Sequence, residues 1–403
     1  MDKLLEKARE IPVIGHYDTV VAGGGFAGVA AALAAARGGN KVLLLERMFM
    51  LGGLGTAGLV TIYLPLCDGR GHQVSFGLAE ELLKLSIKNG YECRYPKPWL
   101  EGGTEEEKAQ TRYQVQYNAA ACAILMEQAL LEAGVEIMYG TTVCDCAVQN
   151  SSITHLIVEN KSGRSAYSCG NVIDCTGDAD ICKLSGEDTA VFSQGNVLAA
   201  WYYFCDETGY NLKMLGFSDI PDEFKTEEQK KKATVQKRYV GLEAKEISDM
   251  MIDSHASFFN HFLAGRTISQ THMPATIASI PQIRMTRRVE GAYTMKRSEH
   301  HTHFADSVGM FGNWHKVNDG EIYELPYSTL YGKKIKNLAT AGRSISVDDS
   351  LWDLTRVIPV CSLSGEAVGT AAALGQNFGE VDIETLQSAL RKNGLKLHID
   401  EVL

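Results

Sequence analysis

Three glycines near the start of the chain have the spacing of a phosphate-binding turn. Gly23, Gly25 and Gly28 form a G-x-G-x-x-G pattern, with Phe26 and Ala27 between the last two. The first glycine permits a tight turn, the second lets the backbone approach a pyrophosphate, and the third lets a helix pack closely on the preceding strand. Free N–H groups at the start of that helix would face the phosphates. The chemistry that this spacing predicts is dinucleotide binding.

The residues on either side of the glycines predict the elements that position them. Residues 19–22 have the β-forming and small apolar composition of a strand, and residues 29–36 form an alanine-rich helical stretch. A second apolar strand, residues 41–45, ends at Glu46, where an acid that binds the adenosine ribose is expected. Together these features predict a βαβ unit over 17–46 that binds a dinucleotide. The alternative is a structural βαβ unit without a ligand.

Length, charge and cysteine content exclude several classes of protein. The 403 residues can bury a large core and favour two domains. A formal net charge of −10 argues against a nucleic-acid surface, and no apolar run approaches the ~20 residues that cross a bilayer. Residues 1–10 are charged and lack the apolar core of a signal peptide. Ten cysteines in a chain of this length suggest reduced thiols of a cytoplasmic protein, and all ten are expected to be buried. The absence of a CxxC motif argues against the usual zinc pattern.

Two further segments place glycine at the end of an expected strand, and both lie far from the first turn. One follows the apolar strand 171–174, and the other follows residues 336–341. The residues at these two ends are Thr176, Gly177, Asp178, Gly342 and Arg343. A nicotinamide dehydrogenase needs one Rossmann unit and a separate catalytic domain, whereas one extended FAD molecule would use all three glycine-bearing ends.

With these segments the chain resembles the FAD-dependent oxidoreductase family, which has the glutathione-reductase-type FAD fold and is related to the fumarate reductase flavoproteins. The resembling segments are 18–58, 172–180, 280–293 and 337–374, with weaker likeness between them. The resemblance implies an α/β fold, in which a Rossmann-type FAD-binding domain (1–187 and 331–403) carries an inserted α+β substrate or cap domain (188–330). Aromatic residues and methionine become frequent after residue 187, which agrees with a new domain there.

The resemblance also assigns residues to a non-covalently bound FAD. Besides the three glycine-bearing ends, these residues are Glu46, Arg47, Gly53, Thr56, Val143, Val357 and Ile358. Arg47 would neutralise phosphate or, alternatively, lie exposed, and the backbone of Val143 would pair with the adenine. The helix that begins near Val357 would direct its N–H groups and dipole at the flavin edge that becomes negative on reduction.

Candidate catalytic residues form two clusters. Arg284 and Arg287, with Arg288 beside them, could clamp a substrate carboxylate or instead form structural ion pairs. His300 and His301 are candidates for proton transfer. The alternative for them is an exposed turn, and the spacing of the histidines over 299–303 matches no metal motif, so no metal is expected. His72 and His315 are further candidates for the acid or base that hydride transfer usually needs.

The expected function is two-electron (hydride) redox on a small organic substrate. The enzyme would oxidise a C–OH or CH–CH group or reduce an activated double bond. The chain carries Trp352 and Asp353 where the family commonly has smaller residues, so the resemblance does not define the substrate. Two alternatives are a thiazole-synthase-like enzyme that consumes a dinucleotide and a non-catalytic flavin-binding sensor. The electron acceptor stays open, and a homo-oligomer is one option for the assembly.

Overall fold

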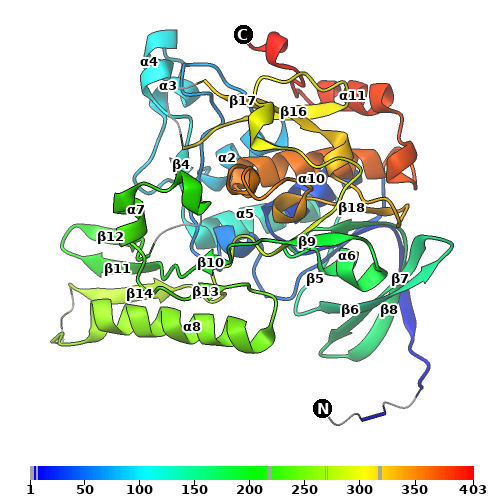
Figure 1. Cartoon of the computed structure of the whole chain (residues 1–403), viewed down its shortest axis with the longest axis horizontal. Helices are drawn as coiled ribbons and strands as arrows, with labels where there is room; N and C mark the ends of the chain where they lie inside the picture. Colours follow the sequence, from blue (N-terminus) through cyan, green and yellow to red (C-terminus); the bar gives the residue numbers. More distant parts are fainter. Residues whose placement is uncertain (1–3, 6–7, 217–219, 268, 270, 316–319) are drawn as a thin grey trace.

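The computed structural model describes residues 4–5, 8–216, 220–267, 269, 271–315 and 320–403. The sequence also predicts a short amphipathic helix over 2–9, but residues 4, 5, 8 and 9 are not helical, and the rest of this range lies outside the described residues. A large sheet with helices packed on it forms one part of the molecule, and a second group of strands and helices lies beside it (Figure 1).

Seven strands form the large sheet, in the order β5–β2–β1–β8–β7–β6, with β18 also paired to β8. Their bounds are β1 Val13–Ala22, β2 Val42–Leu45, β5 Glu136–Met138, β6 Thr142–Gln149, β7 Ser152–Asn160, β8 Gly163–Asp174 and β18 Leu338–Thr340. The pairs β5–β2, β2–β1, β1–β8 and β8–β18 are parallel, whereas β6, β7 and β8 pair antiparallel. All four residues of β2 are buried, as expected for a parallel strand that is covered on both faces. The predicted Rossmann-type α/β sheet is confirmed.

Strand β8 is longer than the sequence predicts. We expect a hairpin strand that ends near Tyr167 and a separate strand over 171–174, whereas the structure has one continuous strand. Gly170 lies in its middle, where a Cβ atom would approach the carbonyl oxygen of Asp18 to 2.7 Å. The glycine therefore permits close approach to β1 and does not break the strand.

Helices α1 (Phe26–Arg37) and α10 (Ile358–Ala372) pack against each other almost backbone to backbone. A Cβ atom on Gly365 would lie 2.2 Å from the carbonyl oxygen of Ala27, and one on Gly369 would lie 2.3 Å from that of Ala31. This close packing fixes the start of α10 relative to the first glycine turn. Helices α2 (Leu78–Ser86), α5 (Ala119–Glu132) and α11 (Ile383–Lys392) pack beside this pair.

The segment between the two halves of the large sheet supplies mainly short strands. They are β9 Thr189–Val191, β10 Asn196–Val197, β11 Tyr202–Asp206, β12 Gly209–Lys213, β13 Arg238–Tyr239, β14 Met273–Ile277, β15 Arg287–Val289, β16 Ser307–Gly312 and β17 Ile322–Pro326. The strands β12, β11 and β14 form an antiparallel sheet next to α8 (Ala244–Phe258), at the lower left of Figure 1. This mixture agrees with the α+β character predicted for the insertion, and the boundaries at 187 and 331 stay predictions. Shorter elements are β3 Ile62–Tyr63, α3 Lys97–Leu100, α4 Glu105–Gln110, β4 Val115–Gln116, α6 Asp180–Ser185, α7 Glu227–Lys231 and α9 Trp352–Thr355.

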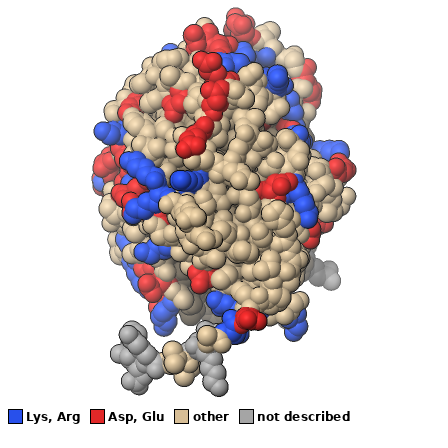
Figure 2. All heavy atoms as spheres, turned by 90° about the vertical axis from the view of Figure 1, so that its right-hand side faces the viewer, with Lys and Arg blue, Asp and Glu red and all other residues tan. Residues whose placement is uncertain are grey.

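The cysteines differ from one another in their exposure to solvent. All ten cysteines are free thiols, but Cys93 is exposed and Cys144, Cys146 and Cys205 are only half-buried, so the prediction that all are buried is wrong for these four. On the face drawn in Figure 2, basic and acidic side chains are interspersed around a broad area without charged groups. Among the described helices, none has the length and apolar character needed to cross a membrane.

Candidate functional site

A cavity of about 820 Å³ lies where the three glycine-bearing strand ends meet. Its volume falls within the range of about 300–1,000 Å³ that small-molecule and cofactor sites occupy. The residues predicted to bind FAD that line it are Gly23, Gly25, Phe26, Ala27, Glu46, Arg47, Gly53, Val143, Thr176, Gly177, Asp178, Gly342, Arg343, Val357 and Ile358. One cavity therefore brings together residues of β1, β2 and β6, residues that directly follow β8 and β18, and the start of α10.

The first glycine turn is shaped to bring backbone against a ligand. Gly23 has φ +104°, and a Cβ atom on it would lie 2.4 Å from the carbonyl oxygen of Cys175. A Cβ atom on Gly28 would lie 1.8 Å from the carbonyl oxygen of Gly23, so Gly28 serves the packing of the turn and does not line the cavity. At Gly25, by contrast, a Cβ atom would meet no protein atom within 4 Å. The open space beside Gly25 belongs to the cavity and fits the pyrophosphate of a dinucleotide.

Glu46 is held in a fixed position at the end of β2. Its two carboxylate oxygens accept N–H groups from Gly24 and Met48, each at 2.7 Å. Burial raises the pKa of Glu46, and the two backbone hydrogen bonds act in the opposite direction. Each oxygen has a second lone pair, and the residue lines the cavity. Its carboxylate is therefore placed to accept hydroxyl groups of a ribose.

Replacing Glu46 with alanine is expected to weaken FAD binding by about 1–3 kcal/mol, the usual cost of a lost hydrogen bond to a charged group. The measurement is the Kd of FAD for the apoprotein, obtained by reconstitution. Glu159, an exposed acid in β7, provides a matched control, and Glu159→Ala should leave the Kd unchanged. An unchanged Kd for Glu46→Ala would mean that this carboxylate does not hold the ribose.

Thr56, also assigned to FAD, lies outside the lining of the cavity. It is buried, and its hydroxyl donates to the carbonyl oxygen of Leu51. A Cβ atom on Gly52, which has φ +97°, would lie 2.4 Å from the Thr56 methyl carbon. Thr56 therefore shapes the loop that places Gly53 against the cavity.

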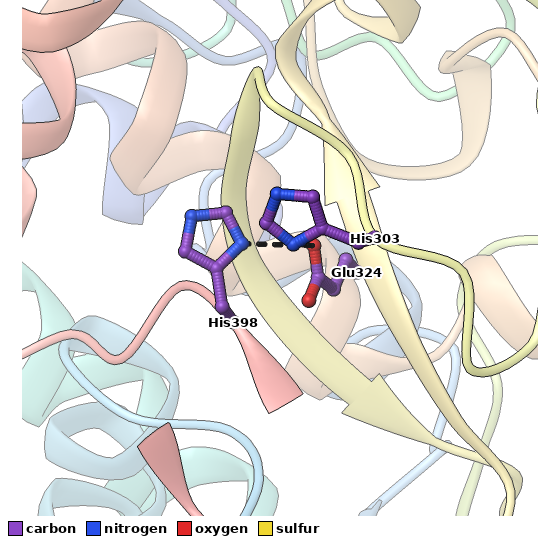
Figure 3. A group of neighbouring side chains, drawn as sticks. All are labelled: His303, Glu324 and His398. Carbon is purple, nitrogen blue, oxygen red and sulfur yellow. Dashed lines mark hydrogen bonds and ion pairs between the residues drawn. The ribbon is translucent and has the colours of Figure 1, made fainter. Parts of the chain in front are cut away.

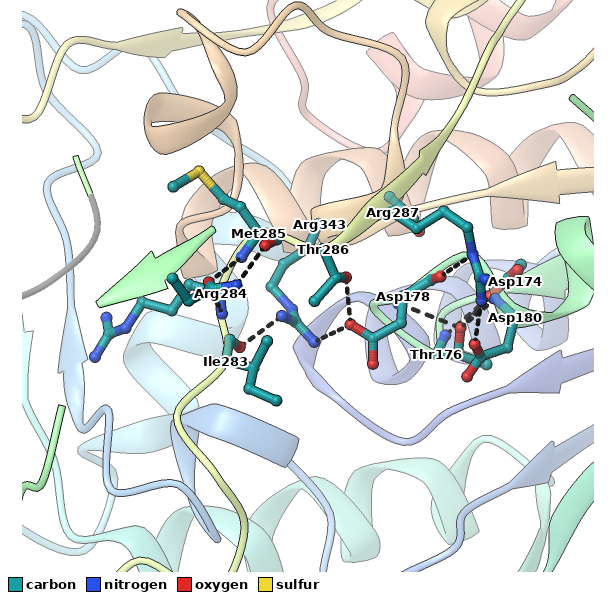
Figure 4. Close-up of polar contacts among 12 residues, drawn as sticks. Asp174, Thr176, Asp178, Asp180, Ile283, Arg284, Met285, Thr286, Arg287 and Arg343 are labelled. Atoms are coloured by element: carbon teal, nitrogen blue, oxygen red, sulfur yellow. Dashed lines mark hydrogen bonds and ion pairs between the residues drawn. The ribbon is translucent and has the colours of Figure 1, made fainter. Parts of the chain in front are cut away.

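A polar network joins the second and third glycine-bearing ends to the inserted segment (Figure 4). The Asp178 carboxylate accepts the Thr286 hydroxyl at 2.6 Å and lies 3.4 Å from the Arg343 guanidinium. The same guanidinium donates to the carbonyl oxygen of Ile283 at 2.6 Å. Arg343 thus fixes the strand ends to each other while its side chain lines the cavity.

Of the three clustered arginines, only Arg284 lines the cavity. It is 3% exposed, and its guanidinium lies 4.9 Å from the centre of the Trp201 ring. Arg287 instead forms an ion pair with Asp180 at 2.6 Å, and Arg288 approaches Asp349 to 3.6 Å. Arg287 and Arg288 therefore form structural ion pairs, which was the alternative to binding a substrate carboxylate.

His315 lines the cavity and is bonded to a buried carboxylate that lies outside the cavity lining. Its Nε2 atom is hydrogen-bonded to Asp353, which is fully buried and also accepts the Arg297 guanidinium at 2.9 Å. Because a carboxylate can only accept, Nε2 carries the proton and Nδ1 is left as an acceptor. Burial lowers the pKa of His315, and the bond to Asp353 acts in the opposite direction. The pair has the arrangement of an oriented acid–base group.

The other candidate histidines lie outside the cavity lining. His300 and His301 occupy an exposed turn, where the N–H of His301 donates to the carbonyl oxygen of Ile322 at 2.8 Å. His72 is also largely exposed and bonds to Asp68 at 2.9 Å. For His300 and His301 the structure thus agrees with the alternative, an exposed turn, and not with a role in proton transfer at the cavity.

Several cavity residues were missed by the sequence analysis. Arg94 and Arg112 come from the polar segment 91–112, whose sequence has no apolar periodicity, and Arg356 lies two residues before α10 begins at Ile358. Burial and the nearby Arg94 charge both lower the pKa of Arg112. Two indole rings, of Trp201 and Trp314, also line the cavity. These arginine and tryptophan side chains form a cluster only in the folded chain, so no local sequence pattern could have identified them.

The chain is similar to three solved structures. One is anhydrotetracycline hydroxylase OxyS from Streptomyces rimosus, with 13% identity and a TM-score of 0.45 over 94% of this chain and 66% of that one. Another is 3-ketosteroid-Δ4-(5α)-dehydrogenase from Rhodococcus jostii RHA1, with 13% identity and a TM-score of 0.44 over 90% of this chain and 97% of that one. The third is p-nitrophenol 4-monooxygenase PnpA from Pseudomonas putida DLL-E4, with 12% identity and a TM-score of 0.42 over 95% of this chain and 81% of that one. The chain thus spans just under two thirds of the length of the hydroxylase. No curated protein matches the sequence.

The family comparison covers most of the chain. The model of the family described as FAD dependent oxidoreductase matches residues 18–197 and 196–390. These ranges include every strand end that lines the cavity. The chain therefore belongs to the FAD dependent oxidoreductase family, whose members are enzymes with FAD as their cofactor.

Proposed function

We propose that this enzyme performs two-electron (hydride) redox on a small organic acid, oxidising a C–OH or CH–CH group or reducing an activated double bond. The observation that carries the proposal is a single cavity in which the FAD-binding loops meet several arginines and the His315–Asp353 pair. When bound, FAD supplies the two-electron acceptor or donor. The ten free thiols agree with a reducing compartment, and we propose the cytoplasm as the location.

The arginines support an acidic substrate. Arg94 and Arg112 both line the cavity, and within the described residues neither guanidinium forms an ion pair with a carboxylate. Burial and mutual repulsion make this placement unfavourable, as the lowered pKa of Arg112 indicates. A bound carboxylate would relieve both costs, and a planar guanidinium can hold it through two parallel hydrogen bonds.

His315 supports proton transfer at the same cavity. The Asp353 carboxylate holds the proton on Nε2, so Nδ1 can accept a proton from a substrate that Arg284 and its neighbours orient. The first turn of α10 adds a positive dipole end at Val357 and Ile358, which also line the cavity. These groups would orient the substrate, move its proton and favour negative charge in the site.

Replacing Arg112 with alanine is expected to weaken the binding of small carboxylates by about tenfold or more, which corresponds to about 1.5–3 kcal/mol for a lost hydrogen bond to a charged group. The measurement is a titration of the holoenzyme with C2 to C8 mono- and dicarboxylates and with the matching amides, followed by the flavin absorbance. The wild-type spectrum should respond to acids and not to amides. Arg164→Ala, which removes an arginine from β8 outside the cavity, should behave like the wild type. Equal responses to acids and amides, or an unchanged response in Arg112→Ala, would contradict the acidic-substrate proposal.

A further inference from the structure

Three side chains from distant parts of the sequence converge outside the cavity (Figure 3). His303 follows the short helix η4 (Arg297–Glu299), Glu324 lies in β17, and His398 precedes the C-terminal turn η8 (Ile399–Glu401). One candidate ligand atom from each residue lies within 4.8 Å of the other two. The prediction that no metal is bound rests on the histidines over 299–303, and it does not consider Glu324 and His398, which are distant in the sequence.

Glu324 is the fixed member of this cluster. Its side chain is 2% exposed, and its two oxygens accept the N–H groups of Phe304 at 2.9 Å and Ile399 at 3.0 Å. These bonds come from two different segments and hold the carboxylate in one orientation. Oε1 has only the Ile399 N–H as a partner among these bonds and keeps a lone pair, whereas Oε2 also accepts the His398 ring, a bond that an ion would replace. N–H partners like these are the usual way in which a metal-binding carboxylate is oriented.

The two imidazoles flank this carboxylate. The Nδ1 atom of His398 donates a hydrogen bond to the Glu324 Oε2 atom at 2.9 Å, and that of His303 lies 3.7 Å from the same oxygen. An ion bound at the His398 Nδ1 atom would take the place of its proton. The two rings are 4.5 Å apart between their centres. The His303 side chain is 69% exposed, so water and ions can reach the cluster from solvent.

We propose that His303, Glu324 and His398 bind a divalent transition-metal ion of the zinc type, with water in the remaining position. Two imidazole nitrogens and one carboxylate oxygen are a donor set that such ions take, whereas Mg²⁺ and Ca²⁺ prefer oxygen ligands alone. The exposed His303 side chain can move the short distance needed to close the site. A bound ion would tie the C-terminal segment to β17 and to the loop after η4. The proposal does not depend on the redox function.

The test is calorimetric titration of the chelator-treated holoenzyme with zinc chloride, together with its Tm with and without zinc. We expect one zinc ion per chain and a higher Tm in its presence, because an ion that binds only the folded chain stabilises it. His303→Ala and His398→Ala should each weaken zinc binding by about tenfold or more. His300→Ala removes an exposed histidine from the same turn and should leave the affinity unchanged.

Several results would overturn the proposal. One is a wild-type protein that binds no zinc in the micromolar range. Another is undiminished binding in both His303→Ala and His398→Ala, which would assign the ion to the thiols or to other groups. A third is a loss in His300→Ala as large as that in His303→Ala. Because His303 is exposed, its alanine variant tests the site without disturbing the core.

Discussion

The variant Gly25→Val is expected to fold and yet to lose FAD completely. A side chain at this position meets no protein atom within 4 Å, so the protein itself offers no obstacle to it. The space that it would enter is the part of the cavity that we assign to the pyrophosphate. A branched side chain there would displace the phosphates. The measurement is the ratio of flavin to protein after gel filtration, with and without added FAD.

Gly375 offers a matched control for this variant. It too has open space at its Cβ position, but it is half-buried and lies outside the cavity. Gly375→Val should therefore retain FAD at the wild-type level. The two variants should also have circular dichroism spectra like that of the wild type. Full FAD occupancy in Gly25→Val would mean that the pyrophosphate does not lie against this turn.

The second large effect is expected from His315→Gln. Loss of a positioned acid–base group usually slows the chemical step by about 10²–10⁴-fold. Glutamine retains a polar group of similar reach but cannot take up a proton, so FAD content should be unchanged. The compound used is a carboxylic acid that perturbs the flavin spectrum in the titration described above. The measurement is the rate at which this compound reduces or reoxidises the flavin under anaerobic conditions. His300→Gln should keep the wild-type rate, because His300 lies outside the cavity.

The pH dependence gives a second readout for His315. As a base it must be neutral, and burial lowers its pKa below the ordinary value of about 6.5. The rate should therefore be maintained as the pH falls to 6.5 and should decline only at lower pH, where the imidazole becomes protonated. His315→Gln should lack this acid limb. An acid limb that persists in His315→Gln would assign the titration to another group.

The sequence predicts those parts of the molecule whose structure depends on residues close to one another in the chain. Within six residues, the turn from Gly23 to Gly28 needs a glycine with positive φ, open space for a phosphate and a close contact between helix and strand. The position of Glu46 is predicted by the usual length of a βαβ unit. The start of α10 at Ile358 is likewise apparent from its alanine- and glycine-rich sequence. Strand β8 was predicted less well, because a glycine used for close packing resembles one used in a turn.

The remaining features depend on contacts between distant residues. Arg284 and Arg287 are equivalent as sequence, but one reaches the cavity and the other is held by Asp180. Arg112 belongs to a segment without periodic pattern, so nothing local indicates that it faces the same cavity. His315 acquires its role from Asp353, which lies 38 residues away in the chain. Such pairings are set by the packing of the whole fold.

The central claim is that the cavity holds FAD non-covalently, and the absorption spectrum of the purified protein tests it most directly. We expect the visible bands of oxidised flavin, and we expect acid precipitation to release a yellow compound that chromatographs as FAD. Release of FMN would contradict the dinucleotide assignment of Gly25 and Glu46. A colourless protein that cannot be reconstituted with FAD would contradict the account as a whole.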